Sequence, residues 1–157
     1  MSEIRRAEDS DIPAILRLLV QVDMVHHKGR PDLFKGPATK YDARELAKIF
    51  RSSRSPVFVY VDDNGIVRGH AFCVVQEHGI NPVLTNIRTL YIDDICIDEQ
   101  ARRQRIGSQL YQAAVAFARE QGCYNVTLNV WTCNPDALAF YESLGMQPQK
   151  IGMEEIL

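Results

Sequence analysis

Residues 89–97, Thr-Leu-Tyr-Ile-Asp-Asp-Ile-Cys-Ile, constrain the fold more than any other stretch, because they are apolar on both faces of an extended strand. A strand of this kind lies inside a sheet that is covered on both sides. A short turn follows, and residues 106–118 then repeat apolar side chains at helical spacing. The sequence therefore predicts an α/β protein in which a buried central strand runs directly into a helix.

The turn between this strand and the helix carries an unusual concentration of positive charge. Arg102, Arg103 and Arg105 stand at the start of the helix, where the backbone dipole is already positive. Each cation at such a place costs roughly 0.3–1 kcal/mol, whereas the free N–H groups of a helix start are good donors to phosphate oxygens. We therefore predict that this turn holds a phosphate or pyrophosphate. The alternative is that the arginines are simply solvated.

Two acids interrupt the apolar central strand. Alternation along a strand sends the neighbouring side chains of Asp93 and Asp94 to opposite faces of the sheet. A carboxylate inside a sheet is costly unless it is paired, solvated or protonated. Either one end of the strand opens into a wet cleft, where an acid can serve as a general base, or both acids have ionic partners elsewhere in the chain.

The rest of the chain divides into segments with recognisable periodicity. Further strands are expected at residues 2–6, 57–61, 66–76, 124–131 and 146–157, the last segment forming one or two strands. Further helices are expected to start near Asp9, Asp42 and Asn134. The predicted order is β-α-α-β-β-β-α-β-α-β, within a single domain over residues 1–157.

Composition narrows the class of protein. A net charge of −2 gives no sign of a nucleic-acid or membrane-surface partner. No apolar run approaches the ~20 residues of a membrane-spanning helix, and the N-terminus lacks a signal-peptide pattern. The four cysteines are widely separated and have no metal-ligand spacing, so we expect reduced thiols, no metal, and a cytoplasmic protein.

Two motifs resemble those of a known family. Residues 102–107, Arg-Arg-Gln-Arg-Ile-Gly, resemble the Gln/Arg-x-x-Gly-x-Gly/Ala signature of the GCN5-related N-acetyltransferases, which wrap it around the pyrophosphate of acetyl-coenzyme A. Arg105 stands where that family most often has glycine, and arginine is poorly suited to a positive φ. Asn134-x-x-Ala137-x-x-x-Tyr141-x-x-Leu144-Gly145 resembles the second signature, whose tyrosine lies beside the sulfur of the cofactor.

The resemblance covers nearly the whole chain and implies a mixed, mostly antiparallel, twisted sheet flanked by helices. It implies acetyl-coenzyme A as the cofactor. Residues 91–97 are similar in sequence to the corresponding strand of the diamine and polyamine acetyltransferase branch. The implied reaction is acetyl transfer to a primary amine, most simply of a small cationic molecule, with a general base and a tyrosine acid. Members of the family often dimerise through terminal strands, so a homodimer is also expected.

The resemblance also implies roles for individual residues. The expected catalytic residues are Tyr141 as the acid and Asp93 or Asp94 as the base. The residues expected to bind the cofactor are Ile95, Cys96, Ile97, Arg102, Arg103, Gln104, Arg105, Ile106, Gly107, Ser108, Asn134, Ala137 and Phe140. In the family the loop after the first helix borders the acceptor pocket, so Phe34 and Tyr41 are candidates for its walls.

Three other functions compete with this interpretation. The acceptor could be a protein lysine or an N-terminal amine rather than a small molecule. The chain could be a sensor that binds acyl-coenzyme A without catalysis, although the presence of both Tyr141 and a strand acid argues against this. It could also be a structural α/β domain with a solvated arginine loop, and the second motif argues against that.

Overall fold

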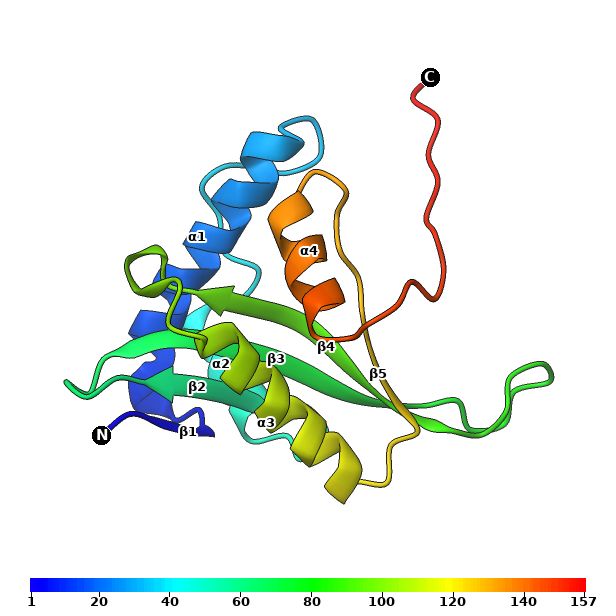
Figure 1. Ribbon diagram of the computed structural model, residues 1–157, viewed down its shortest axis with the longest axis horizontal. Coiled ribbons are helices and arrows are strands. Elements are labelled where there is room, and N and C mark those ends of the chain that lie inside the picture. Colours follow the sequence, from blue (N-terminus) through cyan, green and yellow to red (C-terminus); the bar gives the residue numbers. More distant parts are fainter.

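A computed structural model describes all 157 residues, and its centre is a five-stranded sheet with helices on both faces (Figure 1). The strands are β1 (Glu3–Arg6), β2 (Val57–Val61), β3 (Val67–Glu77), β4 (Arg88–Ile97) and β5 (Asn125–Leu128). The helices are α1 (Ile12–Gly29), α2 (Ala43–Phe50), α3 (Ile106–Glu120) and α4 (Pro135–Ser143), with short 3-10 turns at Asp9–Asp11 and Glu99–Ala101. The strands lie side by side in chain order, and only the β4–β5 pair is parallel.

Strand β4 separates two apolar layers, as its composition predicts. On one face Leu90 and Ile92 pack with Ile106 and Leu110 of α3. On the other face Cys96 joins the core beneath α1 and α2, which is built from the residues Ile15, Leu18, Leu19, Leu46, Val57, Val59 and Phe72 among others. The predicted fold class, a mixed and mostly antiparallel sheet flanked by helices, is therefore confirmed.

The starts of α2 and α4 follow the capping residues that the sequence suggested. The Asp42 carboxylate accepts from the Glu45 N–H at 2.8 Å, and the Glu45 carboxylate accepts in return from the Asp42 N–H. At α4 the side-chain oxygen of Asn134 accepts from the Ala137 N–H at 3.3 Å. These side chains satisfy N–H groups that a helix start otherwise leaves free.

A β-bulge in β4 changes the direction of the two strand acids. Phe72 of β3 lies opposite Asp94 and Cys73 lies opposite Ile92, so Asp93 is an extra residue without a direct partner. In consequence Ile92 and Ile95, three residues apart, both face the α3 core. The prediction that Asp93 and Asp94 point to opposite faces is wrong, because the bulge breaks the alternation and both side chains contact groups on the α1 side.

Beyond Ile92 the parallel pair β4–β5 comes apart. The ladder joins Thr89, Leu90, Tyr91 and Ile92 to residues 125–128, and β5 ends there while β4 continues to Ile97. Residues 93–97 therefore have no neighbouring strand on the β5 side. The sheet opens at this end, next to the start of α3 and the later turns of α4 (Figure 1).

The final strands predicted over residues 146–157 do not form in the structure of the single chain. Residues 146–157 have no secondary structure, and they run away from the sheet as an extended segment (red in Figure 1). A strand needs a hydrogen-bonding neighbour, and nothing in the same chain pairs with this segment although β5 has a free edge. The side chains of Ile151, Met153 and Ile156 are 78, 88 and 76% exposed.

Candidate active site

The turn before α3 adopts a strained backbone. Arg103 has φ 70° and Arg105 has φ 58°, and they are the only residues other than glycine with a positive φ. Arg105 thus takes the left-handed conformation that glycine would adopt at lower cost. Strain of this kind is kept where the surrounding structure holds a functional geometry.

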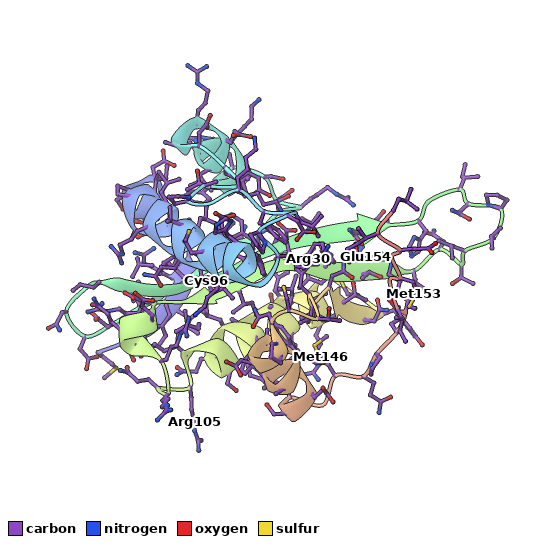
Figure 2. The ribbon with its side chains drawn as sticks, turned by 90° about the horizontal axis from the view of Figure 1, so that it is seen from above. Arg30, Cys96, Arg105, Met146, Met153 and Glu154 are labelled. Atoms are coloured by element: carbon purple, nitrogen blue, oxygen red, sulfur yellow. The ribbon has the colours of Figure 1, made fainter.

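The arginines of this turn have no ionic partner in the protein. Arg102, Arg103 and Arg105 are exposed, as is Gln104, and no ion pair of the chain includes any of the three arginines. Figure 2 shows the Arg105 side chain pointing away from the body of the molecule. The positive charge is thus free to meet an anion.

The start of α3 also keeps free backbone donors. Arg105, at the N-cap, makes no side-chain hydrogen bond to the helix, and the first N–H with an acceptor in the chain is that of Gln109, which donates to Arg105 O at 3.1 Å. The N–H groups of Ile106, Gly107 and Ser108 precede it. Free N–H groups beside unpaired arginines fit a diphosphate.

Helix α4 crosses close to this start. A Cβ atom added to Gly107 would lie 3.0 Å from Cζ of Phe140, so glycine is what allows the Phe140 ring to approach. The neighbouring Ile106 is buried in the α3 core. The two motifs, far apart in the sequence, therefore meet at Gly107 and Phe140, with Asn134 and Ala137 at the first turn of the same helix.

Tyr141 is partly buried, next to the opened end of the sheet. Burial raises the pKa of its hydroxyl well above the usual value of a tyrosine, and the charge of Asp94 raises it further. No hydrogen bond within the chain uses this hydroxyl. Tyr141 therefore stays protonated at neutral pH and lies close enough to Asp94 to be affected by its charge.

Asp94 is held by a buried histidine. Nε2 of His70 lies 2.8 Å from Oδ2 of Asp94, and the His70 side chain is fully buried. Nδ1 of His70 has no partner at all. A neutral imidazole with its hydrogen on Nε2 suits both facts, because it donates to Asp94 and leaves no buried donor unpaired. One carboxylate oxygen of Asp94 stays without a protein donor.

Asp93 accepts hydrogen bonds from the loop between α1 and α2. Its Oδ2 accepts from Nζ of Lys40 at 2.6 Å and from the Tyr41 hydroxyl at 3.3 Å. The Tyr41 ring stacks on Phe72 with centroids 5.6 Å apart. Burial raises the pKa of Tyr41, and the charge of Asp93 adds to this effect. The structure thus brings Tyr41 to the strand acids.

Phe34 lies in an aromatic contact rather than at the acids. Its ring meets Trp131 edge-on, with centroids 5.1 Å apart, and tilts against His26 at 5.0 Å. Nδ1 of His27 donates to the Phe34 carbonyl at 2.7 Å. These contacts tie the loop to the end of α1 and to the segment after β5. Phe34 therefore remains only a predicted wall of the pocket.

The three residues predicted at the open end of β4 differ in what they can offer. The side chains of Ile95 and Ile97 pack against the α3 core. Cys96 turns its thiol toward α1, where Sγ donates to Leu18 O at 3.2 Å (Figure 2). Burial raises the pKa of this thiol, so it is a poor nucleophile. Only the backbone of these residues faces the opening.

Sequence reasoning missed Lys40 and His70 as neighbours of the strand acids. His70 stands in an apolar strand that suggests a structural role, and nothing local indicates that it reaches Asp94 on the neighbouring strand. Lys40 reaches Asp93 from the loop between α1 and α2. The composition of such segments predicts exposure and says nothing about contacts.

Comparison with known proteins identifies the family. The family model described as "Acetyltransferase (GNAT) family" matches residues 23–146. The chain belongs to this family. Human N-acetyltransferase 8 (Homo sapiens) is 29% identical over 122 residues, which make up 73% of the chain and 52% of that protein. Thialysine N-epsilon-acetyltransferase of Bos taurus is 33% identical over 60 residues, 38% of the chain and 35% of that protein.

A solved structure extends the likeness to the whole chain. A mutant of the BH1408 protein from Bacillus halodurans shares 30% identity and covers 99% of both chains, with a TM-score of 0.94. By contrast, the chain spans only about half the length of human N-acetyltransferase 8. Membership in the GNAT family confirms the resemblance carried by the two motifs and assigns the chain to the acetyltransferases.

Two further observations concern other kinds of site. None of the helices combines the length and the apolar character that crossing a membrane requires. No group of three or more His, Cys, Asp or Glu side chains is arranged to hold a metal ion.

Proposed function

We propose that this protein transfers an acetyl group from acetyl-coenzyme A to the primary amine of a small molecule. One observation carries the proposal: the unpaired arginines and free N–H groups at the start of α3 adjoin the opened end of the sheet, where Asp94 and Tyr141 lie together. An anion-binding turn, an acid and a base thus occupy one region.

The residues at this region fit the parts of acetyl-coenzyme A. Residues 102–108 would hold the diphosphate, and remote binding of this kind positions the reacting end of a long molecule. The free backbone edge of residues 95–97 and the side of α4 at Asn134, Ala137 and Phe140 would line the pantetheine arm. When bound, acetyl-coenzyme A supplies an activated acetyl thioester. A backbone N–H of residues 95–97 is our candidate for stabilising the oxyanion.

Asp94 is the better candidate for the base. The amine arrives largely as an ammonium ion, because the pKa of a primary amine is near 10. Asp94 has one oxygen fixed by His70 and one oxygen without a donor from the protein. Both interactions that Asp93 makes use its Oδ2, and they bind it to Lys40 and Tyr41. Asp94 therefore accepts the proton, directly or through a water.

Tyr141 is the candidate acid. Its raised pKa keeps the hydroxyl protonated, so it can donate to the sulfur that leaves as the amide forms. The burial that raises the pKa of Tyr141 keeps its hydroxyl available as a donor, while Asp94 offers an oxygen without a protein donor as the acceptor. A sensor without catalysis would have no use for this pair, and so we place it second.

A small-molecule acceptor is supported by the names of relatives. One relative is a thialysine N-epsilon-acetyltransferase, and thialysine is a small amine. Protein lysines and N-terminal amines form the alternative class of acceptor. Lys40 and Tyr41 come from one loop and both contact Asp93, so the loop covers this side of the site, which favours a small acceptor over a protein surface.

We further propose that the protein is a homodimer in which the C-terminal segments contribute to the contact. Residues 146–157 expose several apolar side chains, and β5 leaves a sheet edge unpaired. A groove of about 400 Å³ lies between α3, β5 and the end of α4, lined by Tyr111, Val115, Val126 and Met146 among others. An extended apolar segment of a second copy suits this groove and edge.

Turnover of labelled acetyl-coenzyme A tests the proposed reaction. Incubation with a panel of amines and with cell extract is followed by separation into low-mass and protein fractions and removal of unreacted acetyl-coenzyme A. The label should then appear in low-mass amides. Asp94→Asn should reduce turnover by roughly 10²-fold or more, as expected for loss of a general base, whereas Asp93→Asn should retain far more activity. Label only in the protein fraction would contradict the small-molecule acceptor, and equal losses in both variants would contradict Asp94 as the base.

A further inference from the structure

Lys40 is held in place beside the strand acids. Its Nζ lies 2.6 Å from Oδ2 of Asp93, and the same ammonium lies 5.6 Å from the centre of the Tyr41 ring. Burial lowers the pKa of Lys40, but the hydrogen bond to Asp93 and the negative charges nearby, chiefly that of Asp93, together outweigh it and the pKa is raised. Lys40 is therefore a fixed cation at neutral pH.

The pair leaves donors of Lys40 unused. An ammonium has three N–H donors, and Asp93 is the only acceptor that Lys40 has in the chain. The side chain of Lys40 is 56% exposed, while that of Asp93 is 17% exposed. The remaining donors can therefore serve a ligand from solvent. Asp93, with its Oδ2 bound to Lys40 and Tyr41, holds the cation in position.

This arrangement changes the charge that an acceptor meets. Two free carboxylates would favour a molecule with several positive charges. In the structure Asp93 is paired with the Lys40 ammonium, whereas no Lys or Arg pairs with Asp94, whose Oδ1 has no protein donor. Because Asp93 and Asp94 are consecutive, with Cα atoms about 3.8 Å apart, the cation and the free carboxylate are close neighbours. An amine that also carries a negative group complements both.

We propose that Lys40 forms an anion-binding subsite, so that the acceptor is a primary amine carrying a carboxylate or a phosphate close to the reacting nitrogen. This inference rests on the proposed acetyl transfer and narrows its acceptor class. The acceptor ammonium pairs with Asp94 while its anionic group accepts hydrogen bonds from Lys40. Both charges of the ligand are then matched, which a diamine does not achieve.

Matched acceptors provide the test. The kcat/KM values of lysine and cadaverine are compared, and those of glucosamine 6-phosphate and glucosamine, so that each pair differs by one anionic group. The wild type should favour the anionic member of at least one pair by about 10-fold or more, as a charge-assisted hydrogen bond provides. The pair that responds distinguishes a carboxylate from a phosphate.

Variants distinguish the effect of Lys40 on acceptor preference from the effect of other positive charges in the loop. Lys40→Met should remove the preference, mainly through KM, and Lys40→Arg should keep most of it. Lys35→Met serves as the matched control, because Lys35 is an exposed lysine of the same loop without an ion pair. Circular dichroism and coenzyme A binding establish that each variant is folded.

Several results would overturn the subsite. The first is the absence of any preference for the anionic member in both pairs. The second is an unchanged ratio in Lys40→Met. The third is mass-spectrometric detection of an acetyl group on Lys40 itself, which would make Lys40 an acceptor. If no amine is acetylated, the proposed reaction fails, and the subsite is then judged by binding. Isothermal titration of the same pairs into the coenzyme A complex must show the same Lys40-dependent preference.

Discussion

At the scale of single residues, the proposed chemistry depends on the different surroundings of Asp94 and Tyr141. The hydroxyl of Tyr141 is kept neutral by its apolar surroundings, and the carboxylate of Asp94 is oriented by His70. Each has a polar atom that no protein group uses. Residues prepared in this way are poised to exchange protons with a substrate.

Replacing Tyr141 by Phe tests the assignment of the acid. Turnover should fall by roughly 10²-fold, the lower range for loss of general acid catalysis, while coenzyme A affinity changes little. Since the pKa of Tyr141 is raised, the wild type should show no loss of turnover from its ionisation below about pH 10, the usual tyrosine value. A pH series of kcat together with titration calorimetry measures both, and unchanged turnover would remove Tyr141 from the mechanism.

How much of the site the sequence predicts depends on the range of each contact. The arginine turn and Tyr141 belong to local motifs, and these motifs identify the family. His70 reaches Asp94 from the neighbouring strand, and Lys40 reaches Asp93 from a loop. These contacts depend on the strand register and on the path of the loop, which local sequence patterns do not reveal. The charge environment of the acceptor is therefore known only from the structure.

At the scale of elements, the start of α3 combines anion-binding capacity with backbone strain. Arg105 occupies the left-handed region at φ 58°, whereas Arg102 has φ −65°. Replacing Arg105 by Gly should raise the free energy of unfolding by about 1 kcal/mol, because glycine adopts this conformation without steric cost. Urea unfolding measures the change.

The matched control is Arg102→Gly, because Arg102 lies in the same turn and has an ordinary negative φ. This substitution relieves no strain and should not raise the free energy of unfolding. If both variants change stability equally, or if Arg105→Gly is the less stable, then the turn is not strained at Arg105.

Helices and strands follow from periodicity, but two element-scale features do not. The bulge at Asp93 adds one residue to β4, and a period of two cannot reveal it, so the predicted directions of the strand acids are wrong. The expected final strands have suitable apolar residues, yet a strand exists only with a partner. Residues 146–157 find none in their own chain.

At the scale of the whole molecule, residues 147–157 are all exposed and have no secondary structure. Arg30 at the end of α1 forms an ion pair with Glu154, so the segment is tied to its own chain while Met153 stays exposed (Figure 2). No residue of α4 is fully buried either. Both features are expected of surfaces that a second copy covers.

Light scattering coupled to gel filtration tests the dimer. The protein should elute with twice the 17.8 kDa mass of one chain, and removal of residues 149–157 should give a monomer with an intact circular dichroism spectrum. Ile151→Glu combined with Met153→Glu should act in the same direction, because charges replace the apolar contact. A wild-type monomer at high micromolar concentration, or a dimer that survives the truncation, would contradict the proposed role of the segment.

Titration of coenzyme A into the purified protein tests the central claim, that the start of α3 receives a diphosphate. The wild type should bind with a Kd well below millimolar, and the affinity should fall as salt rises. Arg102→Gln and Arg103→Gln should each weaken binding by about 10-fold, since each removes a charge-assisted hydrogen bond, whereas Arg119→Gln at the far end of α3 should not. Absence of binding at millimolar coenzyme A, or equal affinity in all variants, would contradict the account.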